Sequence, residues 1–186
     1  MCIMLAVFMG KVLKKKTAVA GDEVTYSLML RQMQKASAIQ HKGIASRHAY
    51  SMDGIDYYCG IRDEDIGILR QKYDVIILDI SFENTFDNTN VTFARMVSRL
   101  SACDEKILVG SMLPWKSREC EKKMERIERF LDIRGLKMVT LAACDKEAVS
   151  IIKKHGVEVV LIPFERNPFV ISGENLRSFL ELLKIT

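Results

Sequence analysis

KYDVIILDIS, residues 72–81, contains the strongest strand candidate of the sequence. Its residues from Val75 to Leu78 are all apolar, and Ile80 continues them beyond Asp79. A strand without a polar side is typical of the centre of a parallel sheet, where helices cover both faces. We therefore expect a parallel sheet in which residues 73–81 form a central strand that is buried on both faces.

Short apolar stretches alternate with stretches of helical period along the rest of the chain. The further predicted strands are residues 17–21, 55–60 (as a short edge strand), 106–111, 137–143 and 157–164. The predicted helices are residues 2–13, 24–40, 90–103, 117–135, 145–156 and 173–184. This alternation predicts an α/β fold, an open and mostly parallel sheet with helices on both faces, in a single domain over residues 1–186.

Length and composition exclude several classes of protein. The chain has 186 residues, 48% hydrophobic and 28% charged, as in an ordinary globular protein. Its net charge is +4 with both signs interspersed, so the charge pattern does not call for a nucleic acid partner. The cysteines contain no C-x-x-C pair, and lysines follow the apolar run Cys2–Met9 instead of preceding it. We therefore expect a cytoplasmic protein without a transmembrane segment, disulfide framework or zinc site.

The predicted sheet directs attention to the carboxyl ends of its strands, where ligands bind in such folds. The candidate residues directly after the predicted strands are Gly21, Asp22, Glu23, Asp79, Ser81, Gly110, Ser111, Pro114, Trp115, Lys116, Ala143, Cys144, Pro163, Phe164 and Glu165. Asp79 is the first candidate, because a carboxylate that ends a buried strand is unfavourable unless it is hydrogen-bonded, metal-bound or part of a site. Trp115 is either an exposed anchor for a partner or a packing residue at the sheet edge.

Four segments, in their order along nearly the whole chain, resemble one protein family. KYDVIILDIS resembles the Walker B strand of the deviant-Walker P-loop ATPases, the MinD/ParA group and its CpaE-like relatives. VEVVLIPFERNP (157–168) resembles the last parallel strand and the Ile-Pro loop beside the adenine, and KILVGSMLPWK (106–116) is similar to the partner-sensing region. The opening MLAVFMGKVLKKKTAVAG (4–21) resembles the helix after the phosphate loop and the second strand.

The resemblance implies a three-layer P-loop NTPase fold and a set of site residues. The nucleotide-site positions would be Asp22, Asp79, Ser81, Ser111, Pro163 and Phe164. Trp115 and Lys116 would be candidates for contact with a partner, and Asp79 would assist Mg²⁺ if nucleotide binds. A protein partner or a homodimer is expected.

The sequence departs from this family at the phosphate loop. No G-x-x-x-x-G-K-[ST] occurs in it, and so the backbone N–H groups, lysine and hydroxyl that hold a triphosphate and Mg²⁺ are missing from the chain as given. We expect a degenerate or N-terminally truncated ATPase domain that is a non-catalytic regulatory or interaction module and needs no cofactor. The alternative is an active ATPase with ATP and Mg²⁺, if the true start lies upstream of Met1. The family's first strand is central in its sheet, so its loss would leave its neighbours with unpaired N–H and C=O groups.

Two further readings of the chain concern catalysis. A receiver-like domain would use Asp79 as its phosphoacceptor, but Ile162 stands where that fold has a lysine before the proline. A catalytic triad lacks support, because no G-x-S-x-G elbow occurs and the cysteines have no histidine nearby in sequence.

Overall fold

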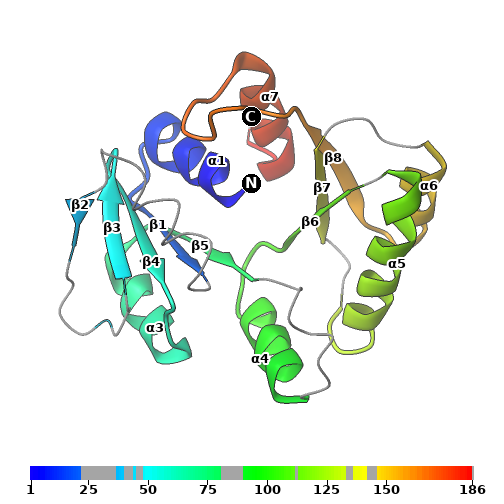
Figure 1. The fold of residues 1–186 in the computed structure, drawn as a ribbon, viewed down its shortest axis with the longest axis horizontal. Helices are drawn as coiled ribbons and strands as arrows, with labels where there is room; N and C mark the ends of the chain where they lie inside the picture. The colour runs from blue at the N-terminus through cyan, green and yellow to red at the C-terminus, as the bar shows by residue number, and fades with distance from the viewer. Residues whose placement is uncertain are drawn as a thin grey trace. The chain divides into compact units, whose positions relative to one another are not determined.

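A computed structural model describes residues 1–21, 37–39, 44, 48–80, 90–111, 113–132, 136–141 and 146–185. The chain divides into two compact units. The first unit is Met1–Phe86 with Asn167–Ile171, and the second is Asp87–Arg166 with Ser172–Thr186. Each unit has its own sheet, whose strands are labelled in Figure 1. The expectation of a single domain over residues 1–186 stays a prediction.

The sheet of the first unit has five strands in the order β2-β3-β4-β1-β5. In chain order they are β1 (Thr17–Gly21), β2 (Ser37–Ala38), β3 (His48–Met52), β4 (Ile55–Cys59) and β5 (Val75–Asp79). β1 runs parallel to β4 and to β5, whereas β3 runs antiparallel to β2 and to β4. Parallel strands connected through helices confirm the predicted α/β class.

The buried central strand is β1, and the prediction that residues 73–81 form the central strand was wrong. Every residue of β1 is buried, whereas in β5 only Ile77 is. The reason is position, because β5 ends the sheet and has β1 as its only sheet neighbour among the described residues. Its apolar sequence is explained by α1 and α3, which both contact it.

β4 lies inside the sheet, so the prediction of an edge strand over residues 55–60 was also wrong. It lies between β1 and the unpredicted strand β3. Asp53 and Gly54 connect β3 to β4 with φ angles of 54° and 78°. Positive φ at both central residues is the geometry of the tight hairpin turn that Asp-Gly favours, because its twist matches that of the strands.

The N-terminal segment is a core helix, as predicted. α1 (Cys2–Val7) continues directly into a π-helical turn, η1 (Phe8–Val12). Val7 and Phe8 are buried, and α1 contacts β1. Lys14, Lys15 and Lys16 are exposed after the helix, which confirms that this end is solvated.

The helix α3 (Asp63–Lys72), which the sequence analysis did not predict, covers the opposite face of β1. Its Leu69 packs in one cluster with Ala18 and Ala20 of β1. Side chains alternate along a strand, so Thr17 and Val19 face the other side of the sheet. Asp65 lies in the first turn of α3. Its buried carboxylate caps this end of the helix, because it accepts the N–H of Arg62 at 2.9 Å, as in one half of a capping box.

The second unit has a parallel three-stranded sheet in the order β6-β7-β8. Its elements are α4 (Asn90–Ser101), β6 (Ile107–Gly110), α5 (Pro114–Glu128), β7 (Lys137–Leu141), α6 (Lys146–Lys154), β8 (Glu158–Ile162) and α7 (Gly173–Leu183). All seven were predicted in this order. α5 begins three residues earlier than expected, because Pro114 at its start loses no helical hydrogen bond. Gly156, with φ of 72°, follows α6 as the predicted stop.

One predicted helix, residues 24–40, falls mostly outside the described residues. Ser37 and Ala38 are described, and they form β2 instead of a helical turn. They pair antiparallel with Ser51 and Tyr50 of β3, so pairing with the hairpin decides their conformation.

Candidate functional site

In the first unit, the carboxyl ends of three parallel strands lie level with one another. Gly21 at the end of β1 pairs in register with Cys59 of β4 and with Asp79 of β5. The N–H of Gly60 donates to the carbonyl of Gly21 at 2.9 Å. Asp79 is half-buried at this end, where the sequence placed it. Its role in a nucleotide site stays a prediction.

In the second unit, a corresponding row is formed by Gly110, Thr140 and Leu161, which are aligned across β6, β7 and β8. Ser111 follows β6, and its carbonyl accepts from the Cys120 thiol at 3.6 Å. A Cβ on Gly110 would approach the Met138 Cε atom to 2.4 Å. A glycine therefore fits at this turn out of β6, because any side chain would need the packed methionine to move.

Pro163 and Phe164 follow β8 at the same end of the second sheet. The Phe164 ring is 70% exposed, so it does not close the core. An exposed ring beyond a strand end is available to a flat ligand or to a partner protein. The predicted role of both residues beside an adenine stays a prediction.

Three predicted site features lie partly or wholly outside the described structure. Asp22 and Ser81 are outside the described residues, and so is the side chain of Trp115, whose backbone belongs to the first turn of α5. Lys116 is exposed there. Asp79 belongs to the first unit and Ser111, Pro163 and Phe164 to the second, so the structure groups the candidates in two sets.

Two polar residues that the sequence analysis missed are fully buried in the second unit. The Thr140 hydroxyl in β7 and the Asn175 side-chain amide in α7 have no hydrogen-bond partner among the described residues. Buried polar atoms of this kind usually bind ordered water or a ligand. Their signal in the sequence is a polar residue at a core position, within KMVTL for Thr140 and within ENLRSF for Asn175.

A hydrogen-bonded network of two tyrosines lies in the first unit, on the face that α3 covers. The Tyr73 hydroxyl donates to an Asp56 carboxylate oxygen at 2.5 Å, and it is 2.6 Å from the Tyr58 hydroxyl. Burial, followed by these two hydrogen bonds, raises the pKa of Tyr73 above its usual value. Tyr73 therefore stays a neutral donor at physiological pH, which suits a structural link and not an acid or base in catalysis.

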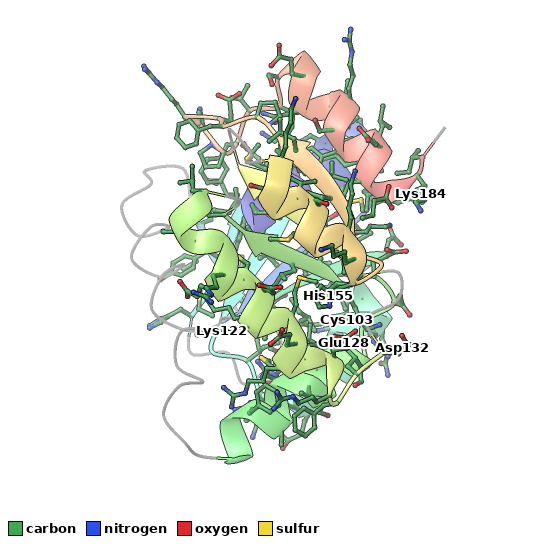
Figure 2. The ribbon with its side chains drawn as sticks, turned by 90° about the vertical axis from the view of Figure 1, so that its right-hand side faces the viewer. Cys103, Lys122, Glu128, Asp132, His155 and Lys184 are labelled. Atoms are coloured by element: carbon green, nitrogen blue, oxygen red, sulfur yellow. The ribbon has the colours of Figure 1, made fainter. Side chains whose placement is uncertain are left out.

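The described residues offer no cluster for a metal ion. No group of three or more His, Cys, Asp or Glu side chains among them could hold one. His155 lies just beyond α6, and its Nδ1 is 3.4 Å from Oε2 of Glu128, the last residue of α5 (Figure 2). This pair lies at helix ends that lead into β7 and β8, away from the carboxyl ends of those strands.

Comparisons with known proteins give a result at the level of structure. No family model matches the sequence, and no curated protein matches it. The MinD cell division protein of Aquifex aeolicus is similar in structure, with a TM-score of 0.64 and 13% identity over 100% of this chain and 92% of that chain. The MinC:MinD cell division protein complex of Aquifex aeolicus gives a TM-score of 0.65 and 14% identity over 99% and 91%. The structure therefore confirms the predicted α/β fold and, at the level of fold, the resemblance to the MinD/ParA group.

Proposed function

We propose that this chain is a MinD/ParA-like domain that acts as a non-catalytic module for binding another protein. The observation that carries the proposal is the MinD-like fold of a sequence that contains no G-x-x-x-x-G-K-[ST]. One of the similar structures is a complex of MinC with MinD, which supports protein binding as a use of this fold. The fold alone does not carry function, so the proposal depends on the site residues.

The chemistry of triphosphate binding supports the non-catalytic part of the proposal. A P-loop holds the phosphates with a row of backbone N–H groups and a lysine, and it places a hydroxyl on Mg²⁺. Asp79 ends β5 and could contribute one carboxylate near a cation. One carboxylate provides neither the phosphate cradle nor the lysine charge, so the 186 residues supply little of the affinity of an ATPase.

Titration calorimetry with Mg-ATP, together with a phosphate-release assay, tests this part directly. We expect no saturable heat with the 186-residue chain and no phosphate release above the rate without protein. A micromolar dissociation constant would contradict the proposal. The genomic DNA immediately upstream of the Met1 codon provides an independent test, since an in-frame strand followed by a glycine-rich Lys-Ser/Thr loop would favour the active ATPase.

A second candidate function, a receiver-like domain, rests on Asp79. This carboxylate is half-buried at the carboxyl end of a parallel strand, which is where a phosphoacceptor would lie. Incubation with acetyl phosphate and Mg²⁺, followed by intact-mass measurement, distinguishes the two functions. We expect no added phosphoryl group, whereas a phosphoryl group that Asp79→Asn abolishes would favour the receiver.

The proposed function also includes a cellular location. Among the residues that the structure describes, no helix has both the length and the apolar character that a membrane crossing requires. We propose a cytoplasmic location, on the basis of the cysteine pattern. Cell fractionation with an antibody against the chain would test it.

A further inference from the structure

Three consecutive lysines, Lys14, Lys15 and Lys16, are exposed where the N-terminal helix leads into β1. The ammonium groups of Lys14 and Lys15 have no ion-pair partner among the described residues. The Lys16 ammonium lies over the ring of Tyr73, 5.2 Å from its centroid. This lysine cluster, Lys14–Lys16, therefore presents positive charge that the described part of the first unit does not pair.

Two carboxylates that contact this segment are engaged elsewhere. Asp53 accepts from the ammonium of Lys11 at 2.6 Å, and Asp74 accepts the backbone N–H of Lys16 at 2.9 Å. Lys11 also lies in the last turn of the helix, where a cation complements the helix dipole. The usual structural role of a cation at a helix end is thus filled by Lys11 and not by the lysine cluster.

The backbone of Lys14 is left-handed, with φ of 55°, directly after the last turn of the helix. Glycine is the usual residue at such a position, because it has no Cβ to strain. A strained residue that is not glycine points to a use for its side chain. Lys184 shows such a use, since its φ is 53° and its ammonium pairs with Glu158 at 3.1 Å. Lys14 has no comparable partner within the described parts of the chain.

The backbone of the lysine cluster is held in place although its side chains are exposed. The Lys15 N–H donates to the Met9 carbonyl at 3.0 Å, and the Thr17 hydroxyl donates to the Lys15 carbonyl at 2.9 Å. The Asp74 N–H donates to the Lys16 carbonyl at 2.9 Å. A binding surface on a fixed backbone loses less conformational entropy when a partner binds.

We propose that the lysine cluster binds a short acidic segment of a partner protein, in which several Asp or Glu residues follow one another. Opposite charges at such a contact accelerate the encounter and exclude partners of the wrong charge. The inference rests on the proposed function, because it names the kind of partner that the interaction module binds and the residues that bind it.

The extent of the surface favours a short segment over an extended anion. Three consecutive residues span only about 10 Å. The exposed carboxylates of Asp53 and Asp74 contact the same segment of the chain, and they would repel a bilayer or a nucleic acid. Stable attachment to a bilayer also needs a hydrophobic signal, of which the exposed Val12 supplies little. A nucleic acid would need a wider basic face.

The experiment measures the dissociation constant of fluorescein-labelled hexaglutamate by fluorescence anisotropy at low ionic strength. The variants are Lys15→Glu and the matched control Lys154→Glu, which makes the same charge change at an exposed position in the last turn of α6. We expect saturable binding by the wild-type chain, weakened by added salt. The dissociation constant should rise at least about fivefold in Lys15→Glu and less than about twofold in Lys154→Glu.

Lys14→Gly separates binding from stability. Glycine adopts the left-handed conformation without strain, so the thermal midpoint of this variant should not fall. The dissociation constant for hexaglutamate should nevertheless rise about two- to fivefold, because one cation is lost. An unchanged dissociation constant would contradict a binding role for Lys14.

Three results would overturn the inference: no saturable binding, equal dissociation constants for Lys15→Glu and Lys154→Glu, or tighter binding to phosphatidylserine–phosphatidylcholine vesicles or poly(dT) than to hexaglutamate. Each would leave the proposed function standing, since that function is tested by Mg-ATP binding and hydrolysis. Acetylation of the wild-type chain gives an answer without any variant. Hexaglutamate should slow the acetylation of Lys14–Lys16 and not that of Lys154, and equal rates with and without the peptide would contradict the proposal.

Discussion

The Tyr73 hydroxyl donates to the Asp56 carboxylate at 2.5 Å. Tyr73 lies two residues before β5, and Asp56 is the second residue of β4. β1 lies between these strands, and its Ala18 is in register with Asp56 and with Ile76. The small alanine side chain lets the tyrosine reach across the central strand. The hydrogen bond therefore links β4 to the segment that leads into β5.

We expect Tyr73→Phe to lower the free energy of unfolding by about 1–3 kcal/mol, because a buried hydrogen bond to a charged acceptor is lost and Tyr58 loses a partner. Urea denaturation followed by circular dichroism would measure the change. An unchanged midpoint would mean that solvent replaces the Tyr73 hydroxyl at both Asp56 and Tyr58.

The same network predicts how stability depends on pH. Burial is the main cause that raises the pKa of Tyr73 and also that of Tyr58, while an unfolded tyrosine titrates near pH 10. The folded pKa is the higher one, so the stabilisation is complete below about pH 10 and is lost as the pH rises through the folded pKa. We expect thermal stability to fall above about pH 10, and to fall less steeply in Tyr73→Phe. A parallel decline in both proteins would contradict the assignment to Tyr73.

Tyr57 provides the contrasting case in the neighbouring position of β4. Its ring is buried, and its hydroxyl has no hydrogen-bond partner among the described residues. Removing a buried, unpaired polar atom does not sacrifice a bond, so Tyr57→Phe should leave stability unchanged or raise it by up to about 1 kcal/mol. Urea denaturation beside Tyr73→Phe gives the comparison. A loss as large as that of Tyr73→Phe would reveal a hydrogen bond to a water or to a residue outside the described structure.

Asp79 should matter more to a site than to stability. It is half-buried at the end of β5. We expect Asp79→Asn to change the free energy of unfolding by less than about 1 kcal/mol, because the amide has nearly the same shape and keeps most hydrogen bonds. Thermal denaturation would measure it. A loss above about 3 kcal/mol would instead identify Asp79 as half of a buried ion pair.

The sequence predicted the elements of the second unit better than the neighbour relations of the first. An apolar strand such as β5 reports that helices cover its faces, but it does not report whether a strand lies on each side. The apolar signal of β1 is weaker, because two of its residues are small alanines. Yet every residue of β1 is buried. Strand order depends on contacts between distant segments, which local patterns do not contain.

Other elements that were not predicted, or were placed wrongly, do have a signal in the local sequence. Asp53-Gly54 between alternating residues is a strong hairpin signal, and it predicts β3 and β4 together. Asp63, Glu64 and Asp65 at the start of α3 are the acidic first turn of a helix. Thr140 and Asn175 are different, because a polar residue in an apolar segment becomes informative only when the fold shows that nothing bonds to it.

The N-terminal helix is the element on which the resemblance to the family's first helix rests. Phe8 is fully buried where α1 passes into η1, and its ring is part of the core of the first unit. We expect Phe8→Ala to lower the free energy of unfolding by about 3–5 kcal/mol, since the lost ring leaves a cavity that the sheet fills only in part. Val12→Ala is the matched control from the same segment, because Val12 is 41% exposed and its change should stay within about 0.5 kcal/mol.

Urea denaturation of both variants, with hydrogen exchange of residues 2–13, would decide between a core helix and a loosely attached segment. A core helix predicts protected amides and a large difference between Phe8→Ala and Val12→Ala. Equal stabilities and rapid exchange over residues 2–13 would show that the segment does not pack on β1. The alignment with the helix that follows a phosphate loop would then fail at its first element, and β1 would need another cover for the face that carries Thr17 and Val19.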